Sequence, residues 1–159
     1  MTNNTLSNLF LDQSKDLIWM INSDLLLVYA NQAYLSLMKE VSGEEKKLNQ
    51  TIFTKGFGEN YIQKWSDYYK RAFNGEYFEV EEHFFNSEKN AVQYSHISFR
   101  PIREENNEIV AVACQSKDIT LQVQQQSEAN HLMDSSLDVF CTINEAGEFE
   151  YVSAAAEAH

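Results

Sequence analysis

The feature that most restricts the fold of this sequence is a run of three strand-like segments with no helix between them. Phe78 and Val80 flank Glu79 in an alternation with the period of a β-strand. Two more such segments, 92–102 and 109–116, follow after short polar turns. Strands joined so closely must be antiparallel neighbours, because a parallel return needs a crossover of roughly a dozen residues. The sequence therefore excludes a doubly wound parallel sheet.

The first half of the chain supplies two more strands and the helices. Residues 17–30 are largely apolar on both sides of a turn signal, which predicts two strands in tight connection. Asn31 is a favourable N-cap for a short helix, and a longer helix is predicted around 62–73, where apolar residues recur every three or four positions before Asn74-Gly75. The order predicts an α+β fold: a five-stranded antiparallel sheet with helices packed on one face.

Composition and cysteine usage limit the possible partners and the compartment. There are 12 basic and 24 acidic residues, a net charge of −12, and no basic cluster, so nucleic acid is not an expected partner. No apolar run approaches the roughly 20 residues of a membrane span, and the N-terminus lacks the pattern of a signal peptide. Cys114 and Cys141 lack metal-ligand or CxxC spacing, as expected of free thiols in a reducing compartment. We expect a cytoplasmic location, with a membrane anchor elsewhere in a longer protein left open.

Sequence motifs of catalysis are missing from the chain. It contains no GxGxxG, GxxxxGK, GxSxG or HExxH pattern. We therefore predict no catalytic residues, no metal site and no enzyme activity for these 159 residues.

A repeat links the two ends of the chain. DSSLDVFCTIN at 134–144 matches DQSKDLIWMIN at 12–22 when the sequence is displaced by 122 positions without a gap. Seven identities in a gapless register of more than twenty residues are typical of tandem modules, although two hairpins of similar composition are an alternative. The identical positions in the first copy are Asp12, Ser14, Asp16, Ile21, Asn22, Tyr29 and Ala33.

Two further segments carry a family resemblance. VYANQAY at 28–34, with Asn31 at its centre, resembles the strand-to-helix junction of the PAS domain family. HISFRPIREENNEIVAVACQSKDIT at 96–120 is similar to the end of a PAS domain, and only Asn107 departs from the glycine usual in the family. The resemblance implies four parts: a polar tail at 1–8, a PAS domain at 9–120, a helical linker at 121–131, and the truncated start of a second PAS domain at 132–159.

The resemblance also implies a cavity between the sheet and the helices that holds a small molecule or cofactor in many relatives. Large aromatic side chains at these positions could instead fill the space themselves, so a ligand site and a packed core both stay open. The candidate pocket residues, placed by register from Pro101 and Asp118, are Trp19, Ile21, Trp65, Tyr69, Phe78, Val80, Glu82, Ser95, Ile97, Phe99, Val112, Cys114 and Ser116.

Glu82 is unusual among these candidates because alternation places a carboxylate at an apolar position. An unpaired buried charge would be costly. The residue could contact a ligand, could pair with an arginine or lysine, or could reach water from an edge strand or a bulge.

The identity of any cofactor is unknown from the sequence. Haem-binding relatives usually hold iron through a histidine on a helix, but the predicted helical span 31–74 has no histidine. Flavin photosensors of the family use a cysteine in a helical NCR motif, whereas both cysteines here fall on predicted strands. Haem and flavin-adduct chemistry are therefore disfavoured.

The C-terminal side of the module predicts an output connection. Asp118 and Thr120 are capping residues before a segment of helix formers without Gly or Pro. The resemblance implies that a signal passes through this junction to the linker helix. We expect a sensory PAS module of a multi-domain signalling protein such as a sensor histidine kinase. Its expected partners are a small-molecule ligand, a second copy in a homodimer, and downstream domains; the alternative is a ligand-free interaction or dimerisation module.

Overall fold

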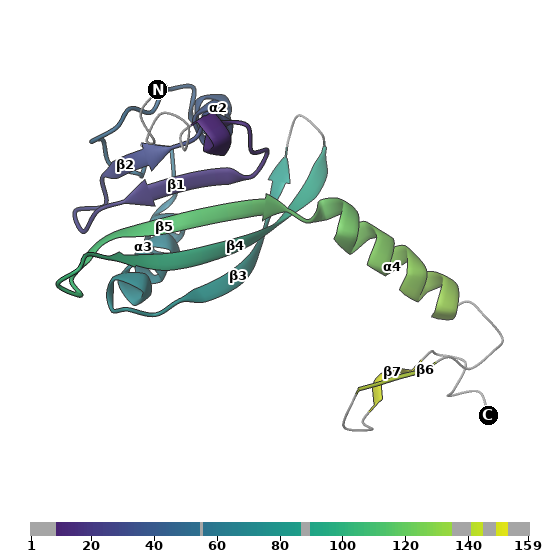
Figure 1. Ribbon diagram of the computed structural model, residues 1–159. Coiled ribbons are helices and arrows are strands. Elements are labelled where there is room, and N and C mark those ends of the chain that lie inside the picture. The colour runs from purple at the N-terminus through teal and green to yellow at the C-terminus, as the bar shows by residue number, and fades with distance from the viewer. Residues whose placement is uncertain (1–8, 55, 87–89, 135–140, 145–148, 153–159) are drawn as a thin grey trace. The chain divides into compact units, whose positions relative to one another are not determined.

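The computed structural model describes residues 9–54, 56–86, 90–134, 141–144 and 149–152 (Figure 1). The predicted tail at 1–8 and the middle of the predicted turn at 86–90 lie outside the described residues. The chain forms two compact units, the first ending at Asp118 and the second beginning at Ile119. Each unit is described by itself.

The first unit contains a five-stranded antiparallel sheet in the order β2-β1-β5-β4-β3 (Figure 1). The central strand β5 pairs with both β1 and β4, so the last strand of the unit lies beside the first. This arrangement confirms the predicted fold class. The strand bounds are Leu17–Ile21 for β1, Leu27–Ala30 for β2, Phe78–Asn86 for β3, Ala91–Arg103 for β4 and Ile109–Asp118 for β5.

The turn between β1 and β2 is closed by Asn22 through its backbone and its side chain. Asn22 Oδ1 accepts hydrogen bonds from the backbone N–H groups of Asp24 at 3.1 Å and Leu26 at 2.9 Å. The backbone N–H of Asn22 donates to the carbonyl oxygen of Leu26 at 3.0 Å, so the Asx turn adds to the backbone pairing. Leu25 takes the left-handed conformation, with φ of 59°.

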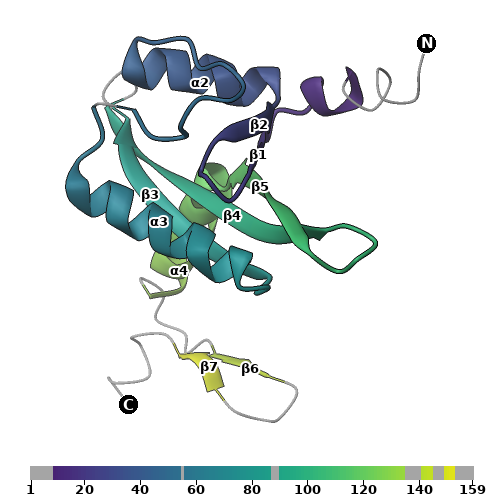
Figure 2. The ribbon, with the colours of Figure 1, turned by 90° about the vertical axis from the view of Figure 1, so that its left-hand side faces the viewer.

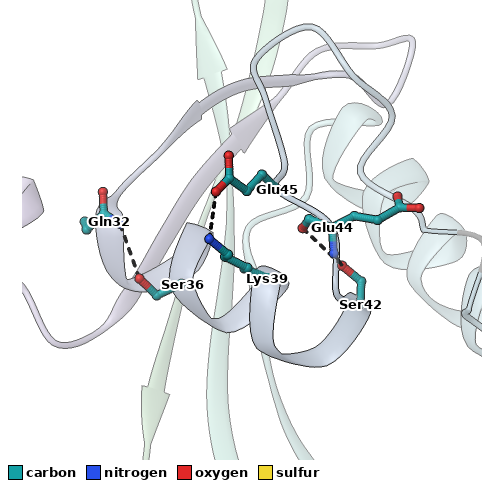
Figure 3. Close-up of polar contacts among 6 residues, drawn as sticks. All are labelled: Gln32, Ser36, Lys39, Ser42, Glu44 and Glu45. Carbon is teal, nitrogen blue, oxygen red and sulfur yellow. Dashed lines mark hydrogen bonds and ion pairs between the residues drawn. The ribbon is translucent and has the colours of Figure 1, made fainter.

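Helix α2 spans Gln32–Ser42 and has the predicted caps. The Asn31 side chain accepts from the N–H of Tyr34 at its start, and Gly43 takes the left-handed conformation at its end, with φ of 71°. Its outer side carries exposed polar contacts, including the 2.7 Å ion pair of Lys39 with Glu45 (Figure 3). Such exposed pairs add little stability, so α2 depends on its buried face.

Helix α3 spans Glu59–Phe73 and ends at Asn74, followed by Gly75 with φ of 97°. The atom nearest to a Cβ on Gly75 would be Nη2 at the flexible end of Arg103, which can move aside, so glycine suits this turn because of its left-handed conformation. Helix α3 packs against β4 and β5, and α2 packs against β1 (Figure 2). The two helices cover the inner face of the sheet.

Apolar side chains from the sheet, α2, α3 and the loop between the helices form one core. In this core the rings of Phe78 and Phe99 stack with centroids 4.8 Å apart. The buried core residues are Trp19, Ile21, Leu27, Tyr34, Ile52, Tyr69, Ala72, Phe78, Ile97, Phe99, Val112 and Cys114.

The second unit contains helix α4, Thr120–Asp134, and a hairpin of β6, Cys141–Ile143, with β7, Phe149–Val152. The helix includes the predicted linker at 121–131 and continues past it. Residues 135–140 and 153–159 of the predicted second module lie outside the described residues.

The hairpin of the second unit repeats the backbone pairing of β1 with β2. Cys141 pairs with Val152 and Thr142 with Tyr151, and the register then shifts by one residue before the next pair. The first hairpin has the same pairs 122 positions earlier, with the shift at the same point. The repeat in the sequence is therefore also a repeat of strand register and bulge.

Candidate functional site

The first unit encloses a cavity of about 280 Å³ between the inner face of the sheet and the helices. Strands β1, β4 and β5 form its floor, and α2, α3 and the edge strand β3 form its walls. The loop residues Ile52, Phe53 and Phe57 lie along one side. The lining residues are Leu17, Trp19, Tyr34, Leu37, Met38, Val41, Ile52, Phe53, Phe57, Tyr61, Lys64, Trp65, Tyr69, Glu82, His83, Phe84, Ser95, Ile97 and Ser116.

The predicted pocket residues separate into two groups. Seven of them line the cavity, and the other six lie in or against the core without lining it. Trp65 and Tyr69 come from α3, and the other members of both groups come from the strands. The lining group is Trp19, Trp65, Tyr69, Glu82, Ser95, Ile97 and Ser116, and the core group is Ile21, Phe78, Val80, Phe99, Val112 and Cys114.

Side-chain size along β4 and β5 explains this division. The inner face carries Ser95 and Ser116 where the strands approach Asp118, and we call this part of the face the hollow end. The opposite part, around Phe99 and Val112, is the filled end, because the Phe99 ring occupies the space below α3. Small side chains leave a gap that large ones close.

Aromatic rings form the walls of the hollow end. Trp65 lies 6.2 Å from Trp19, 5.6 Å from Tyr61 and 6.0 Å from Tyr69, measured between ring centroids. Trp19 stacks on Tyr34 at 5.1 Å, and its Nε1 donates a hydrogen bond to Tyr69 Oη at 3.2 Å. These contacts hold the rings in place around the cavity.

Burial keeps the tyrosines of the wall uncharged. It raises the pKa of Tyr34 and of Tyr69 well above the ordinary value of a phenol. Desolvation and the nearby Glu82 carboxylate raise the pKa of Tyr61 to about 12. Burial also raises the pKa of the Cys114 thiol, which stays protonated and is therefore a poor nucleophile.

Glu82 lies at the rim of the cavity on the edge strand β3. Its Oε2 lies 2.6 Å from Nζ of Lys64, and its Oε1 accepts a hydrogen bond from Tyr68 Oη at 2.7 Å. The alternatives for Glu82 were a ligand contact, a pair with an arginine or lysine, and an edge position. The structure shows both the edge position and a pair with a lysine. Burial and the hydrogen bond to Glu82 raise the pKa of Tyr68 to about 12.

Asn31 connects three segments next to the hollow end. Its Oδ1 accepts from the N–H groups of Ile18 and Tyr34, both at 3.1 Å. Its Nδ2 donates to the carbonyl oxygens of Leu11 at 3.2 Å and Asp16 at 2.9 Å. All four bonding positions of this buried amide are used, so Asn31 fixes the start of β1 against the start of α2.

Asp118, the first of the two predicted junction residues, lies at the end of the sheet that holds the cavity. Asp118 is the last residue of β5 and pairs across the strands with Ser95 of β4, which lines the cavity. Thr120 is the first residue of α4. The floor of the cavity is therefore one strand pair away from the junction.

Sequence reasoning missed the contributions of α2 and of the following loop. The apolar face of α2, which supplies Leu37 and Met38, could have been recognised from its helical spacing. The loop residues Ile52 and Phe53 carry no periodic signal. Alternation from Phe78 and Val80 places His83 on the outer face of β3, yet it lines the cavity, in the second half of this edge strand.

The described residues do not contain a cluster of three or more His, Cys, Asp or Glu side chains that could hold a metal ion. His83 is the histidine on the cavity lining, and it lies on a strand. Within the described part of the chain, none of the helices combines the length and the hydropathy needed to cross a bilayer.

Comparison with known families decides the identity of the fold. A family model described as "PAS fold" matches residues 11–124, which is most of the chain. The chain belongs to the PAS family. This confirms the resemblance of the two junction segments, and PAS modules are generally sensory rather than catalytic.

Solved structures share this PAS fold at low identity. The PAS domain of a protein from Colwellia psychrerythraea aligns with a TM-score of 0.53 and 15% identity over 76% of this chain and 99% of that one. A C-terminal domain from Streptococcus mutans gives 0.54 and 16% over 79% and 94%. An RNA-binding light-oxygen-voltage receptor gives 0.56 and 14% over 82% of this chain but only 37% of its own. A comparison with curated proteins gives no match. At these identities the likeness shows the fold alone.

Proposed function

We propose that this PAS module senses a small molecule in the cavity at the hollow end and signals through Asp118 and Thr120 to α4. The observation that carries the proposal is the cavity itself, about 280 Å³ of space on the inner face of a sheet that is otherwise filled. Its floor includes a hydroxyl, that of Ser116, that makes no hydrogen bond within the described part of the chain. A polar group inside an apolar space is what a ligand site offers.

Strand pairing supplies the route from the cavity to the output. Ser116 lies opposite both Leu17 of β1 and Ile97 of β4, and Ser95 lies opposite Asp118. A ligand that moves either serine therefore acts on the last residue pairs that β5 makes with its neighbouring strands. The chain continues directly from β5 into α4, so a change in the ladder reaches the helix within two residues.

We further propose that the module is one of at least two in series within a multi-domain receptor, with a histidine kinase as the output domain. The matching register and bulge of β6 with β7 support residues 132–159 as the start of a second PAS domain, joined to the domain at 9–120 by a linker at 121–131. The described cysteines, Cys114 and Cys141, are both free, which suits the reducing cytoplasm.

Exposed apolar side chains favour a second candidate function, a ligand-free interaction or homodimerisation module. Phe85 and Val92 lie opposite each other near the sheet edge with 61% and 39% of their surfaces exposed. Phe10 is 76% exposed. Apolar side chains grouped in this way are found at contacts between proteins.

Native mass spectrometry of protein purified from its own cells, with an absorption scan, separates the two functions. A sensor gives a bound small-molecule mass that is released on denaturation. A ligand-free module gives the apo mass at every concentration, with a dimer that grows as concentration rises. The apo mass alone contradicts the ligand proposal.

A further inference from the structure

The charges on the cavity lining cancel each other. Of the lining residues, Lys64 and Glu82 carry permanent charges, and their Nζ and Oε2 atoms are 2.6 Å apart. Resting on the function proposed above, we propose that the cavity selects a small, flat, uncharged ring molecule with a polar N–H or O–H group. It discriminates against both carboxylates and ammonium ions of the same shape.

The size of the cavity sets the size of the ligand. Drug-sized ligands occupy cavities of roughly 300–1,000 Å³, and this one holds about 280 Å³. One ring or two fused rings fit such a space. Trp19, Tyr34 and Trp65 place aromatic rings in the wall of the cavity. Aromatic rings pack by offset stacking or edge to face, and both arrangements favour a flat ligand over a branched one.

Serine hydroxyls on the floor supply the polar contacts. Ser116 is 5% exposed and Ser95 is half-buried, and neither hydroxyl makes a hydrogen bond within the described residues. A hydroxyl can donate and accept, so each can bond a neutral N–H, O–H or carbonyl group. One polar group on an otherwise apolar ring is enough to orient it.

An ion of either sign finds no free counter-charge in the lining. An anion would need the Lys64 ammonium and a cation the Glu82 carboxylate, and either one breaks the ion pair. Glu82 would then keep only its hydrogen bond from Tyr68, and Lys64 would keep no partner among the described residues. The tyrosines stay protonated, as their raised pKa values show, and the remaining titratable group is His83 at the rim. An ion would also lose its hydration on entry. A neutral ring avoids both costs.

Three probes of one shape test this charge selection. Indole is neutral, indole-3-acetate is an anion and tryptamine is a cation. Titration calorimetry at mildly alkaline pH, where free imidazole is uncharged, compares them on the wild-type chain. Indole is expected to bind about tenfold more tightly than either ion, a difference of about 1.4 kcal/mol. Equal or tighter binding of an ion overturns the inference.

Matched variants show whether the ion pair causes the selection. Glu82→Gln leaves Lys64 unpaired and should tighten indole-3-acetate by about three- to tenfold, and Lys64→Gln should do the same for tryptamine. Indole should change by about twofold or less in both. Unchanged ion affinities in both variants overturn the inference.

The outcome for the probes is separable from the outcome for the sensor function. If none of the probes binds while protein from cells carries a bound mass, the ligand class is wrong and the sensor function stands. If the cellular protein is also free of ligand, both fail.

Discussion

The two ends of the inner sheet face differ in how densely side chains pack on them. At the filled end, Phe78 and Phe99 stack and Tyr69 meets Phe99 edge to face, so the space under α3 is occupied by side chains. At the hollow end, the strands carry Ser95 and Ser116, and a cavity remains. The same strands and the same helix border both ends. The difference lies in residue size at alternate positions.

Hydrogen bonds replace packing at the hollow end. Asn31 makes four buried hydrogen bonds beside β1. Lys46 donates to the carbonyl oxygens of Thr51 at 2.7 Å and Phe53 at 2.9 Å, which holds the loop that closes the cavity. Partial burial lowers the pKa of Lys46. Directional bonds fix a backbone around a gap that packing alone would tend to collapse.

The largest expected effect comes from opening a gap at the filled end. Phe99→Ala should lower the free energy of unfolding by about 3–5 kcal/mol, because it removes a fully buried ring from several aromatic contacts. Phe57→Ala, a half-buried ring on the cavity lining, should cost about 1 kcal/mol. Urea unfolding measures both. Equal losses would contradict the contrast between the two ends.

Removing the Asn31 amide tests the polar support of the hollow end. Asn31→Ala should lower the free energy of unfolding by about 2–3 kcal/mol, because it leaves buried N–H and C=O groups unpaired. Asn31→Asp keeps the acceptor but turns carboxylate oxygens toward the carbonyls of Leu11 and Asp16, so it should cost at least as much near neutral pH. A loss under about 0.5 kcal/mol in Asn31→Ala would show that packing holds this end too.

Enlarging two neighbouring inward positions of β5 gives a matched comparison. Cys114→Leu should cost about 1–3 kcal/mol, because the filled end has no room for the added carbons. Ser116→Leu should change the free energy of unfolding by about 0.5 kcal/mol or less and should abolish ligand binding, because the leucine enters the cavity. Thermal unfolding with a binding titration checks both. The same cost at both positions would mean that the hollow end is closely packed.

The alkaline pH dependence of stability gives the smallest effect. Burial raises the pKa of Tyr34 in the folded state. Its contribution to the free energy of unfolding is therefore complete below about pH 10, where the tyrosine of the unfolded chain also keeps its proton. Above that pH the unfolded chain loses the proton first, and stability falls. Tyr34→Phe should make this fall shallower by up to about 1.4 kcal/mol per pH unit. The test is the free energy of unfolding of both proteins, measured through the alkaline pH range. If it falls equally with pH in the wild type and in Tyr34→Phe, the pKa of Tyr34 is not raised by burial.

The fold could be predicted from sequence because its signals are local. Short turns force the last strands into antiparallel pairs, and Asn31 and Gly43 mark the ends of α2 within a few residues. The repeat predicted a second hairpin, and its register follows the first.

The lining of the cavity could be predicted only in part, because alternation gives the direction of a side chain and not the space in front of it. Ser116 and Val112 both point inward, but only the aromatic rings on α3 and on neighbouring strands decide which of them meets a gap. The pairing of Glu82 with Lys64 joins residues 18 positions apart through the packing of α3 on the edge strand. Neither fact has a local pattern in the sequence.

Both tryptophans of the chain line the cavity, which makes their indole N–H resonances direct reporters of occupancy. A nitrogen-proton NMR titration with the neutral ring probe therefore tests the central claim. We expect the probe to change the chemical shifts of the Trp19 and Trp65 side chains and of the Ser95 and Ser116 amides. The amide of Val112 should keep its chemical shift. Shifts confined to Phe85 and Val92 on the exposed edge, or none at either tryptophan, would contradict it.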